Sequence, residues 1–525
     1  MVMEQIAEEA KEVKKVVKNT LSICPECNMI ISAEIVERDR KIFLEKECPK
    51  HGLFIDLYYG DAEMYKKFSK YAHDGKGTGS PNINIIGYSC PANCGLCPGH
   101  KSHTALANIV VTNRCDLACW YCFFYAEKAG YVYEPTIDQI REMVKAIRRE
   151  YPVAGNSIQL TGGEPALRDD LPEIIKVIKE EGVDHIQLNT DGIRLSHDFE
   201  FFKKVKEAGV SNLYLSFDGV TPRTNPKNHW EAPKVIENAR KLNVGVVLVP
   251  TIIKGVNDHE LGEIIRFAFK NIDIIRAVNF QPVSLTGRIT HKEREKLRIT
   301  IPDCIIKIEE QTGGEIPRDA WFPVPACTPL THIIEALLKS PKYELSPHFA
   351  CGAGTYVFKS RDRLVPITEF IDVDGLIKYL QSKADELEAG KNRIITVAKI
   401  LWEFKKFIRE DKQPEGINVK KMIYEIILKH DYKSVGDWHR RSLFIGMMHF
   451  QDKYNYDIER VMRCSIHYPM PDGRIIPFCA FNVIPEWYRD RVQRLYGIPI
   501  EEWEKKTGKK ITEQYYRRIL QVEAD

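Results

Sequence analysis

Between residues 107 and 285, hydrophobic runs of strand length alternate with stretches whose apolar positions recur at helical spacing. The runs lie at 107–112, 157–161, 185–190, 212–217, 244–252 and 275–283. The helical stretches between them lie at 136–150, 170–181, 198–208, 231–241 and 258–270. Strands that each feed a helix predict a parallel sheet with right-handed crossovers. In such sheets the functional groups gather at the carboxyl ends of the strands.

The pattern changes on both sides of this region. Residues 4–19 have the spacing of a short amphipathic helix, and residues 22–60 alternate as strands at 30–36, 41–47 and 53–59. Beyond residue 300 the spacing is mostly helical, at 303–311, 329–339, 373–388, 393–411, 418–430, 455–462, 500–507 and 512–522.

The composition is that of an ordinary globular chain, with 44% hydrophobic and 28% charged residues. The net charge of +3 is too balanced to favour a nucleic-acid partner. No apolar run reaches the roughly 18–20 residues of a membrane span, and the charged N-terminus does not resemble a secretory signal. We therefore expect a cytoplasmic protein without a transmembrane segment, and peripheral membrane contact is left open.

The cysteine count changes this picture. The chain has 14 cysteines, and nine of them lie in three close groups before residue 123. In a chain that is not secreted, such spacing indicates metal ligands and not disulfides. Cys304 is different because it lies in a helical stretch, where we expect it to pack in the core.

The strongest motif is the loop Cys115-Asp-Leu-Ala-Cys119-Trp-Tyr-Cys122, directly after the first predicted strand of the parallel sheet. Three thiolates at these spacings can bind three irons of a 4Fe–4S cluster and leave the fourth iron open. A zinc site is the competing interpretation, but it needs a fourth ligand in the loop. A C-x-x-x-C-x-x-C loop in this setting resembles the radical S-adenosylmethionine (SAM) superfamily, in which the open iron binds SAM. The resemblance implies that Tyr121 lies along the adenine.

The same resemblance implies further SAM contacts at the ends of later strands. Gly162, Gly163 and Glu164 begin a GGEP motif after the second strand. Glycines let a ligand approach the backbone, and a carboxylate can accept from the ammonium of SAM. Asn189 and Ser216, at the ends of the third and fourth strands, resemble groups that hold the carboxylate and ribose of SAM. For these two, ordinary turn chemistry is the alternative.

The sequence leaves the role of two later polar residues open. Asn257 and Gln281 lie at later strand ends and can serve cofactor or substrate.

Three cysteines and one histidine near the N-terminus predict a mononuclear metal site. Cys24 and Cys27 form one knuckle, and Cys48 with His51 forms a second knuckle about twenty residues later. Together they predict a closed tetrahedral site for zinc or iron with a structural role.

The remaining cysteines predict two auxiliary iron–sulfur clusters. Cys90, Cys94 and Cys97 repeat the spacing of the SAM loop, and His100 or His103 is the candidate fourth ligand. The second predicted set consists of loop cysteines in the C-terminal part: Cys327, Cys351, Cys464 and Cys479. Scattered buried thiols are the alternative for this second set. Asp472-Gly473 predicts a hairpin turn between its last two members.

Pattern and resemblance together predict an α/β fold with a partial (β/α)6 barrel as a radical SAM core. A small N-terminal metal-binding β unit precedes the barrel, and a mainly helical iron–sulfur domain follows it. The expected domains are 1–80 for the N-terminal helix and metal unit, 81–106 for an auxiliary cluster, 107–300 for the barrel and 301–525 for the C-terminal domain.

A narrower resemblance extends over almost the whole chain. The N-terminal knuckles, the CGLCPGH segment and the CSIHY…IPFCAFN segment are similar to an archaeal group of radical SAM proteins. That group contains tetraether lipid synthases and proteins described as pterin methylases of methanopterin biosynthesis. The chain departs from the group at Ala105, where relatives carry a cysteine, and this makes a histidine ligand more necessary.

The tetraether resemblance implies an enzyme that joins terminal methyl carbons of phytanyl chains in archaeal ether lipids through a 5′-deoxyadenosyl radical. It also implies SAM, three 4Fe–4S clusters, one mononuclear zinc or iron, an ether phospholipid substrate and a low-potential electron donor such as ferredoxin. One rival is a radical SAM methylase of a dihydropterin, which would require a small polar pocket and not a long apolar tunnel. The other rival is a non-catalytic iron–sulfur electron carrier, which would have no use for a vacant iron.

Overall fold

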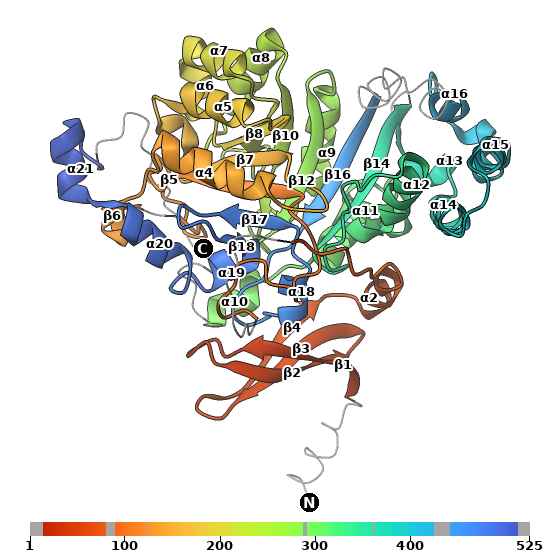
Figure 1. The fold of residues 1–525 in the computed structure, drawn as a ribbon, viewed down its shortest axis with the longest axis horizontal. Helices are drawn as coiled ribbons and strands as arrows, with labels where there is room; N and C mark the ends of the chain where they lie inside the picture. The colour runs from red at the N-terminus through yellow and green to blue at the C-terminus, as the bar shows by residue number, and fades with distance from the viewer. Residues whose placement is uncertain are drawn as a thin grey trace, which may run out of the picture.

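The computed structural model describes residues 14–79, 90–124, 126–286, 291–360, 363–424 and 441–512. It contains a four-stranded antiparallel sheet near the N-terminus and a thirteen-stranded mixed sheet through the rest of the chain. The two sheets lie at different ends of the molecule in Figure 1, with the four-stranded sheet in red.

The predicted parallel sheet is present. Its strands are β5 (Leu106–Thr112), β7 (Ser157–Gly162), β8 (His185–Thr190), β9 (Asn212–Ser216), β10 (Gly245–Val249) and β12 (Ile275–Pro282). They pair in parallel in this chain order, so their carboxyl ends meet at one edge. The predicted helices between them are α4 (Ile137–Arg148), α5 (Leu171–Glu180), α7 (Phe199–Ala208), α8 (Ala232–Leu242) and α9 (Leu261–Lys270). This confirms the partial barrel.

Helix α4 illustrates why these segments are helical. The side chain of Thr136 accepts a hydrogen bond from the backbone N–H of Gln139, whose side chain accepts from the backbone N–H of Thr136. This reciprocal cap satisfies two donors that the first turn would otherwise leave unpaired. The helix then buries its apolar face, which includes Ile140, Val144 and Ile147, against the sheet.

The C-terminal half contributes strands as well as helices. β13 (Phe322–Pro323), β14 (Gly352–Ser360), β15 (Arg363–Pro366) and β16 (Ser442–Met448) continue the sheet beyond β12, while β11 (Thr251–Ile252) pairs with β12. At the other edge β17 (Ile466–Pro469) pairs with β5 and forms the predicted hairpin with β18 (Ile475–Pro477). The sheet therefore crosses the predicted limit at residue 300, and the division into four domains stays a prediction.

Most of the predicted C-terminal helices are also present. They are α11 (Ile301–Gln311), α12 (Thr328–Leu338), α14 (Val373–Glu388), α15 (Arg393–Glu403), α16 (Val419–Tyr424), α18 (Ile458–Met462) and α21 (Ile500–Thr507). Figure 1 shows α12, α14, α15 and α16 grouped on one side of the extended sheet. Cys304, on α11, is fully buried in the main core, which confirms its predicted packing role. The predicted continuation of the 418–430 helix beyond residue 424 and nearly all of the 512–522 helix lie outside the described residues.

The remaining elements are short connections and edges. They are α2 (Ala62–Ser69), α3 (Ala126–Ala129), β6 (Tyr131–Val132), η1 (Pro165–Leu167), α6 (Ile193–His197), α10 (His291–Leu297), η2 (Arg318–Ala320), η3 (Val324–Cys327), α13 (Ile367–Phe370), η4 (Phe404–Phe407), η5 (Glu410–Lys412), α19 (Phe478–Val483), α20 (Arg489–Tyr496) and β19 (Ile498–Pro499).

The N-terminal sheet corrects one prediction. Its strands are β1 (Lys15–Ile23), β2 (Ile30–Arg38), β3 (Lys41–Cys48) and β4 (Gly52–Tyr59), of which the last three were predicted. The predicted helix over residues 4–19 is wrong from residue 15 onward, because β1 pairs with β2 along its length. β-Branched Val16 and Val17 suit a strand, and pairing with a preformed hairpin outweighs a weak helical pattern. Residues 1–13 lie outside the described part of the chain.

Within the described residues, every helix falls short of the length and apolar content that a membrane crossing requires.

Candidate active site and metal centres

The carboxyl ends of the barrel strands surround a cavity of about 240 Å³. Cys115, Cys119 and Cys122, from the loop after β5, all line it. The GGEP glycines and Glu164 line the same cavity after β7, and Asn189 and Ser216 line it from β8 and β9. The structure therefore brings together the residues that the sequence placed around SAM. Their individual contacts with SAM stay predictions.

The three cysteines suit a buried iron–sulfur cluster. Burial raises the pKa of all three thiols, that of Cys119 to about 12. Without a metal such thiols stay protonated, whereas iron binding stabilises the thiolate. Backbone N–H groups of Leu117 and Phe124 lie 3.4 Å from the sulfurs of Cys115 and Cys122, respectively. These donors would stabilise negative sulfur in a bound cluster.

The GGEP turn lies directly against the start of the cysteine loop. Backbone N–H groups of Gly163 and Glu164 donate to the carbonyls of Thr112 and Arg114, both at 2.8 Å. A Cβ atom on Gly162 would lie 2.0 Å from the Thr112 carbonyl oxygen, and one on Gly163 would lie 1.9 Å from that of Arg114. Only glycine fits at these two positions, so the turn fixes the base of the cysteine loop.

The Glu164 carboxylate joins two strand ends. One oxygen accepts from the backbone N–H of Ala166 and from the hydroxyl of Thr190, and the other accepts from the backbone N–H of Asp191. Burial, followed by the nearby charge of Asp191, raises the pKa of Glu164. These contacts give Glu164 a structural role at the site, and its predicted contact with the SAM ammonium stays a prediction.

A buried polar network extends from the cysteine loop to β9. The Tyr121 hydroxyl donates to Asp218 at 2.6 Å, and the Lys227 ammonium lies 2.7 Å from the same carboxylate oxygen. Lys227 also donates to the Ser216 hydroxyl at 2.6 Å. Burial lowers the pKa of Lys227, but Asp218 and the neighbouring cysteines outweigh burial and raise it overall. A positive charge is thus held beside the cluster loop.

The sequence interpretation missed Lys227, because its loop contains no motif that distinguishes it from other surface loops. Asn257 plays a structural part, since its amide donates to the carbonyls of Asp218 and Thr251. Gln281, the other residue left open, lines the cavity.

The inner face of the barrel carries several amide side chains, which the sequence interpretation also missed. Asn108 on β5, Gln159 on β7 and Asn279 on β12 line the cavity together with Asn189 and Gln281. Gln187 on β8 extends this set by donating to Gln159 at 2.6 Å. The signal for these residues was their alternation with core residues along the strands, which places them on the opposite face of the sheet.

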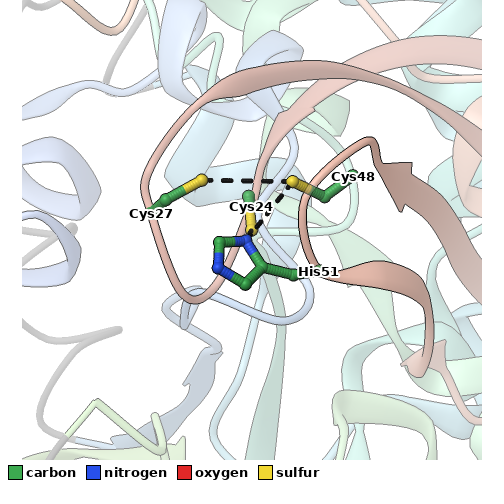
Figure 2. A group of neighbouring side chains, drawn as sticks. All are labelled: Cys24, Cys27, Cys48 and His51. Carbon is green, nitrogen blue, oxygen red and sulfur yellow. Dashed lines mark hydrogen bonds between the residues drawn. The ribbon is translucent and has the colours of Figure 1, made fainter.

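The N-terminal knuckles converge as predicted (Figure 2). The His51 Nδ1 atom lies 3.4 Å from the sulfur of Cys24 and 3.5 Å from that of Cys48, and the sulfurs of Cys27 and Cys48 are 4.0 Å apart. Burial raises the pKa of Cys48, but hydrogen bonds from the Lys50 backbone and His51 outweigh it and lower the pKa to about 6. Three sulfurs and one imidazole nitrogen at these separations suit a tetrahedral zinc ion.

Four of the seven predicted auxiliary cysteines lie in one apolar cluster with Cys122 of the SAM loop. Cys94 and Cys479 are buried in one apolar cluster, against which Cys90, Cys122 and Cys464 pack. The sulfur of Cys351 accepts from the Arg460 guanidinium at 3.3 Å. Cys351 is close enough to Cys464 and Cys479 to interact with them electrostatically.

Three candidate auxiliary ligands, Cys327, His100 and His103, have other contacts. The Cys327 thiol donates to the Val324 carbonyl at 3.1 Å. The Nε2 atom of His100 contacts the Cys464 carbonyl at 2.8 Å and Nε2 of His467 at 3.1 Å. His103 is fully buried and its Nε2 accepts from the backbone N–H of Glu344 at 3.2 Å. The choice between His100 and His103 as the fourth ligand stays open.

Comparison with known proteins identifies two parts of the chain. The radical SAM superfamily model matches residues 109–268, and the model of the HMPTM N-terminal zinc ribbon domain matches residues 16–60. The protein is therefore a radical SAM enzyme, whose chemistry uses SAM, a 4Fe–4S cluster and an electron donor, and it carries a zinc ribbon. We call residues 16–60 the ribbon below.

Several relatives are similar over different lengths. A 7,8-dihydro-6-hydroxymethylpterin dimethyltransferase from Methanocaldococcus jannaschii is 47% identical over 498 residues, covering 93% of this chain and 97% of that protein. A GTP 3′,8-cyclase from Aquifex aeolicus is 34% identical over 186 residues, covering 33% of this chain and 56% of that protein. A radical SAM methyltransferase structure from Sphaerobacter thermophilus is 13% identical and covers 60% of this chain and 79% of that chain, with a TM-score of 0.29.

The first of these relatives corrects the expected reaction. The predicted coupling of phytanyl chains is wrong, because the relative that matches nearly end to end is a pterin dimethyltransferase. The cysteine framework is common to both expected activities, so cysteine spacing alone could not separate a lipid from a pterin. The chain belongs to the family of radical SAM proteins that includes this pterin dimethyltransferase.

Proposed function

We propose that this protein methylates a dihydropterin of the 6-hydroxymethyl type by radical SAM chemistry. The observation that carries the proposal is the 47% identity to a 7,8-dihydro-6-hydroxymethylpterin dimethyltransferase over 93% of this chain. Near-complete coverage of both chains includes the ribbon, the barrel and the C-terminal half, so the similarity is not limited to the common radical SAM core.

The cavity supports a small polar substrate. Amides from Asn108, Gln159 and Asn279 line it. A pterin edge presents both donors and acceptors, and an amide side chain offers both. Buried polar groups of this kind strongly discriminate a ligand that can pair with them from one that cannot.

The chain's own residues would prepare the site for the cofactor. Cys115, Cys119 and Cys122 would hold the cluster, and a bound cluster with SAM supplies the radical that abstracts hydrogen from the substrate. The Gly162–Gly163 turn would bring backbone groups close to SAM. Lys227, held by Asp218 and Ser216, would place a positive charge near the cofactor's anionic groups.

We include two auxiliary 4Fe–4S clusters in this proposal, which gives three clusters and one zinc ion. The first would use Cys90, Cys94 and Cys97 with His100 or His103, and the second would use Cys351, Cys464 and Cys479 with Cys327. Burial of Cys94 and Cys479 in one apolar cluster with Cys90 and Cys464 supports sites close to the SAM loop. Such positions suit electron delivery from a low-potential donor such as ferredoxin.

Hydrogen abstraction tests the substrate directly. The reconstituted, reduced protein is incubated with SAM and with 7,8-dihydro-6-hydroxymethylpterin that carries deuterium on its reduced ring and side-chain carbons. We expect deuterium in the 5′-deoxyadenosine product, measured by mass spectrometry. Expression in a pterin-producing host should in addition yield pterins in which methyl groups replace hydrogen.

Two controls make the experiment decisive. Cys119→Ala should abolish 5′-deoxyadenosine formation, because the cluster loses one of its three anchors. An archaeal ether lipid in place of the pterin should give no deuterium transfer. The proposal would be refuted if an otherwise active enzyme, supplied with labelled pterin, formed 5′-deoxyadenosine without deuterium.

A further inference from the structure

A further candidate metal site lies outside both the cavity and the ribbon. The Nε2 atoms of His73 and His332 lie 2.8 Å and 3.0 Å from the same carboxylate oxygen of Glu344. The ligating atoms of the three residues all lie within 4.8 Å of one another. His73 follows α2, His332 lies on α12 and Glu344 follows α12. Two imidazoles and one carboxylate from separate segments therefore converge on one point.

The hydrogen bonding of His332 calls for a cation between these groups. Its Nδ1 atom lies 2.9 Å from the amide oxygen of Gln381, which can only accept. Nδ1 therefore carries a hydrogen, so the Nε2 atom of a neutral His332 would present its lone pair to the Glu344 carboxylate. Two acceptors at 3.0 Å repel one another unless a proton or a metal ion lies between them. A metal-binding histidine is held in the same way when its other nitrogen donates to an oxygen.

The surroundings leave one Glu344 oxygen for such a cation. The second oxygen accepts from the backbone N–H of Lys76 at 3.0 Å. The Lys76 ammonium pairs with Glu335, so the nearest lysine charge is already balanced by another carboxylate. The Glu344 side chain is 1% exposed, whereas that of His73 is 35% exposed. The carboxylate is thus fixed and desolvated, while the His73 side gives an ion access from solvent.

We propose that His73, His332 and Glu344 bind a divalent transition-metal ion, with zinc as the ion of choice. Two imidazole nitrogens and one carboxylate oxygen form a common donor set for zinc, and they leave a coordination position open for water. Zn–N and Zn–O distances of about 2.0–2.2 Å require only a small opening of the present cluster. The ion would tie the segment that follows α2 to α12, and this proposal does not depend on which substrate the barrel binds.

Zinc stoichiometry tests the proposal. The full-length protein with its clusters loaded is equilibrated with excess Zn²⁺, desalted and analysed by elemental mass spectrometry. Wild type should hold one zinc more per chain than His73→Ala or Glu344→Gln. Glu344→Gln keeps an oxygen for the Lys76 N–H but removes the anionic ligand. The control, His185→Ala, removes an exposed histidine at the start of β8, at the opposite edge from the cavity, and should match wild type.

A ribbon variant separates the two zinc sites. Cys27→Ser should lose the ribbon zinc but keep the second one, and the double variant Cys27→Ser with His73→Ala should lose both. Gln381→Leu should weaken the second site about 10- to 100-fold, since it releases the Nδ1 of His332. Equal zinc contents in wild type, His73→Ala and Glu344→Gln would overturn the proposal and leave the cluster as a protonated histidine–carboxylate pair.

Discussion

Asn108 has a buried amide oxygen for which the described part of the chain supplies no donor. The residue lines the cavity, so we expect a substrate donor to pair with this oxygen. Asn108→Leu keeps the size of the side chain but removes the acceptor. A lost buried hydrogen bond costs about 1–3 kcal/mol, which corresponds to a rise in the pterin KM of about 5- to 150-fold.

The measurement is pterin-dependent formation of 5′-deoxyadenosine at increasing pterin concentrations. Asn212→Leu is the matched control, because Asn212 lies at the opposite end of a barrel strand, at the start of β9. An unchanged KM in Asn108→Leu would exclude the amide oxygen from substrate recognition.

Glu150 is a buried carboxylate that should make stability depend on pH. It is 3% exposed, and burial raises its pKa from 4.5 to about 7, although Thr104 donates to it through both its backbone N–H and its hydroxyl. The unfolded chain releases this proton near pH 4.5 and the folded chain near pH 7. Stability is therefore lost as the pH rises across this window, by about 3 kcal/mol in total.

Glu150→Gln removes this ionisation and keeps an oxygen for Thr104. We expect the melting temperature of the variant, relative to that of wild type, to be higher at pH 8 than at pH 5. The control is Glu142→Gln on the exposed surface of α4. Lys145 lowers the pKa of Glu142, so this substitution should change the pH dependence of stability only slightly and in the opposite direction. Parallel pH profiles for wild type and Glu150→Gln would contradict this account.

At the scale of elements, the turn between β7 and η1 is the most constrained connection of the site. A methyl group on Gly163 would lie 1.9 Å from the Arg114 carbonyl oxygen, which is backbone and cannot move aside cheaply. Gly163→Ala should therefore displace the turn from the cysteine loop and lower SAM cleavage at least tenfold, measured as 5′-deoxyadenosine formation. Iron content should fall as well if the loop no longer holds its cluster.

The control for this turn is Gly245→Ala at the start of β10. There an added Cβ meets only the Arg276 side chain at 3.4 Å, an ordinary contact. This variant should keep its iron and its activity. Full activity in Gly163→Ala would show that the close approach of the two loops is not required.

The barrel elements could be predicted because the local sequence pattern of each one agrees with the conformation that it has in the folded chain. β8 lies where the sequence placed it, and α4 begins at a capping residue visible in the sequence. β14 was missed because Gly352 and Gly354 weaken a strand pattern, and the strand is fixed by pairing with distant β16. β1 was assigned to a helix for the same reason: its pairing with β2 decides its conformation.

The residues of the candidate site also differ in how far the local sequence could predict them. Cys115, Cys119 and Cys122 were predictable because a short-range spacing carries their chemistry. Asn108 was missed although its alternation with core residues along β5 places it on the inner face of the sheet. Lys227 was not predictable, because it reaches the site through the folding of a loop without a motif. His73 and Glu344 are 271 residues apart, so no local spacing could join them.

At the scale of the whole molecule, a buried ion-pair network holds the ribbon against the rest of the chain. Asp56 on β4 lies 2.6 Å from the Arg298 guanidinium and 3.0 Å from that of Arg294. Arg298 also lies 2.8 Å from Asp452, which follows β16. The side chains of Arg298, Asp56 and Asp452 are 3%, 6% and 1% exposed, so water screens these charges little. One arginine thus joins the ribbon, the segment after α10 and the C-terminal half.

Arg298→Met should cost about 3–5 kcal/mol, because it leaves two buried carboxylates without their shared partner. We expect a lower melting temperature and faster hydrogen exchange in β4 than in wild type. The loss should shrink as the pH falls, since protonation of Asp56 and Asp452 removes the negative charges that Arg298 balances. The control is Arg240→Met, which breaks an exposed pair with Asp273 and should cost no more than about 1 kcal/mol. If both variants lost the same stability, or if β4 exchanged no faster in Arg298→Met, the network would not be what attaches the ribbon.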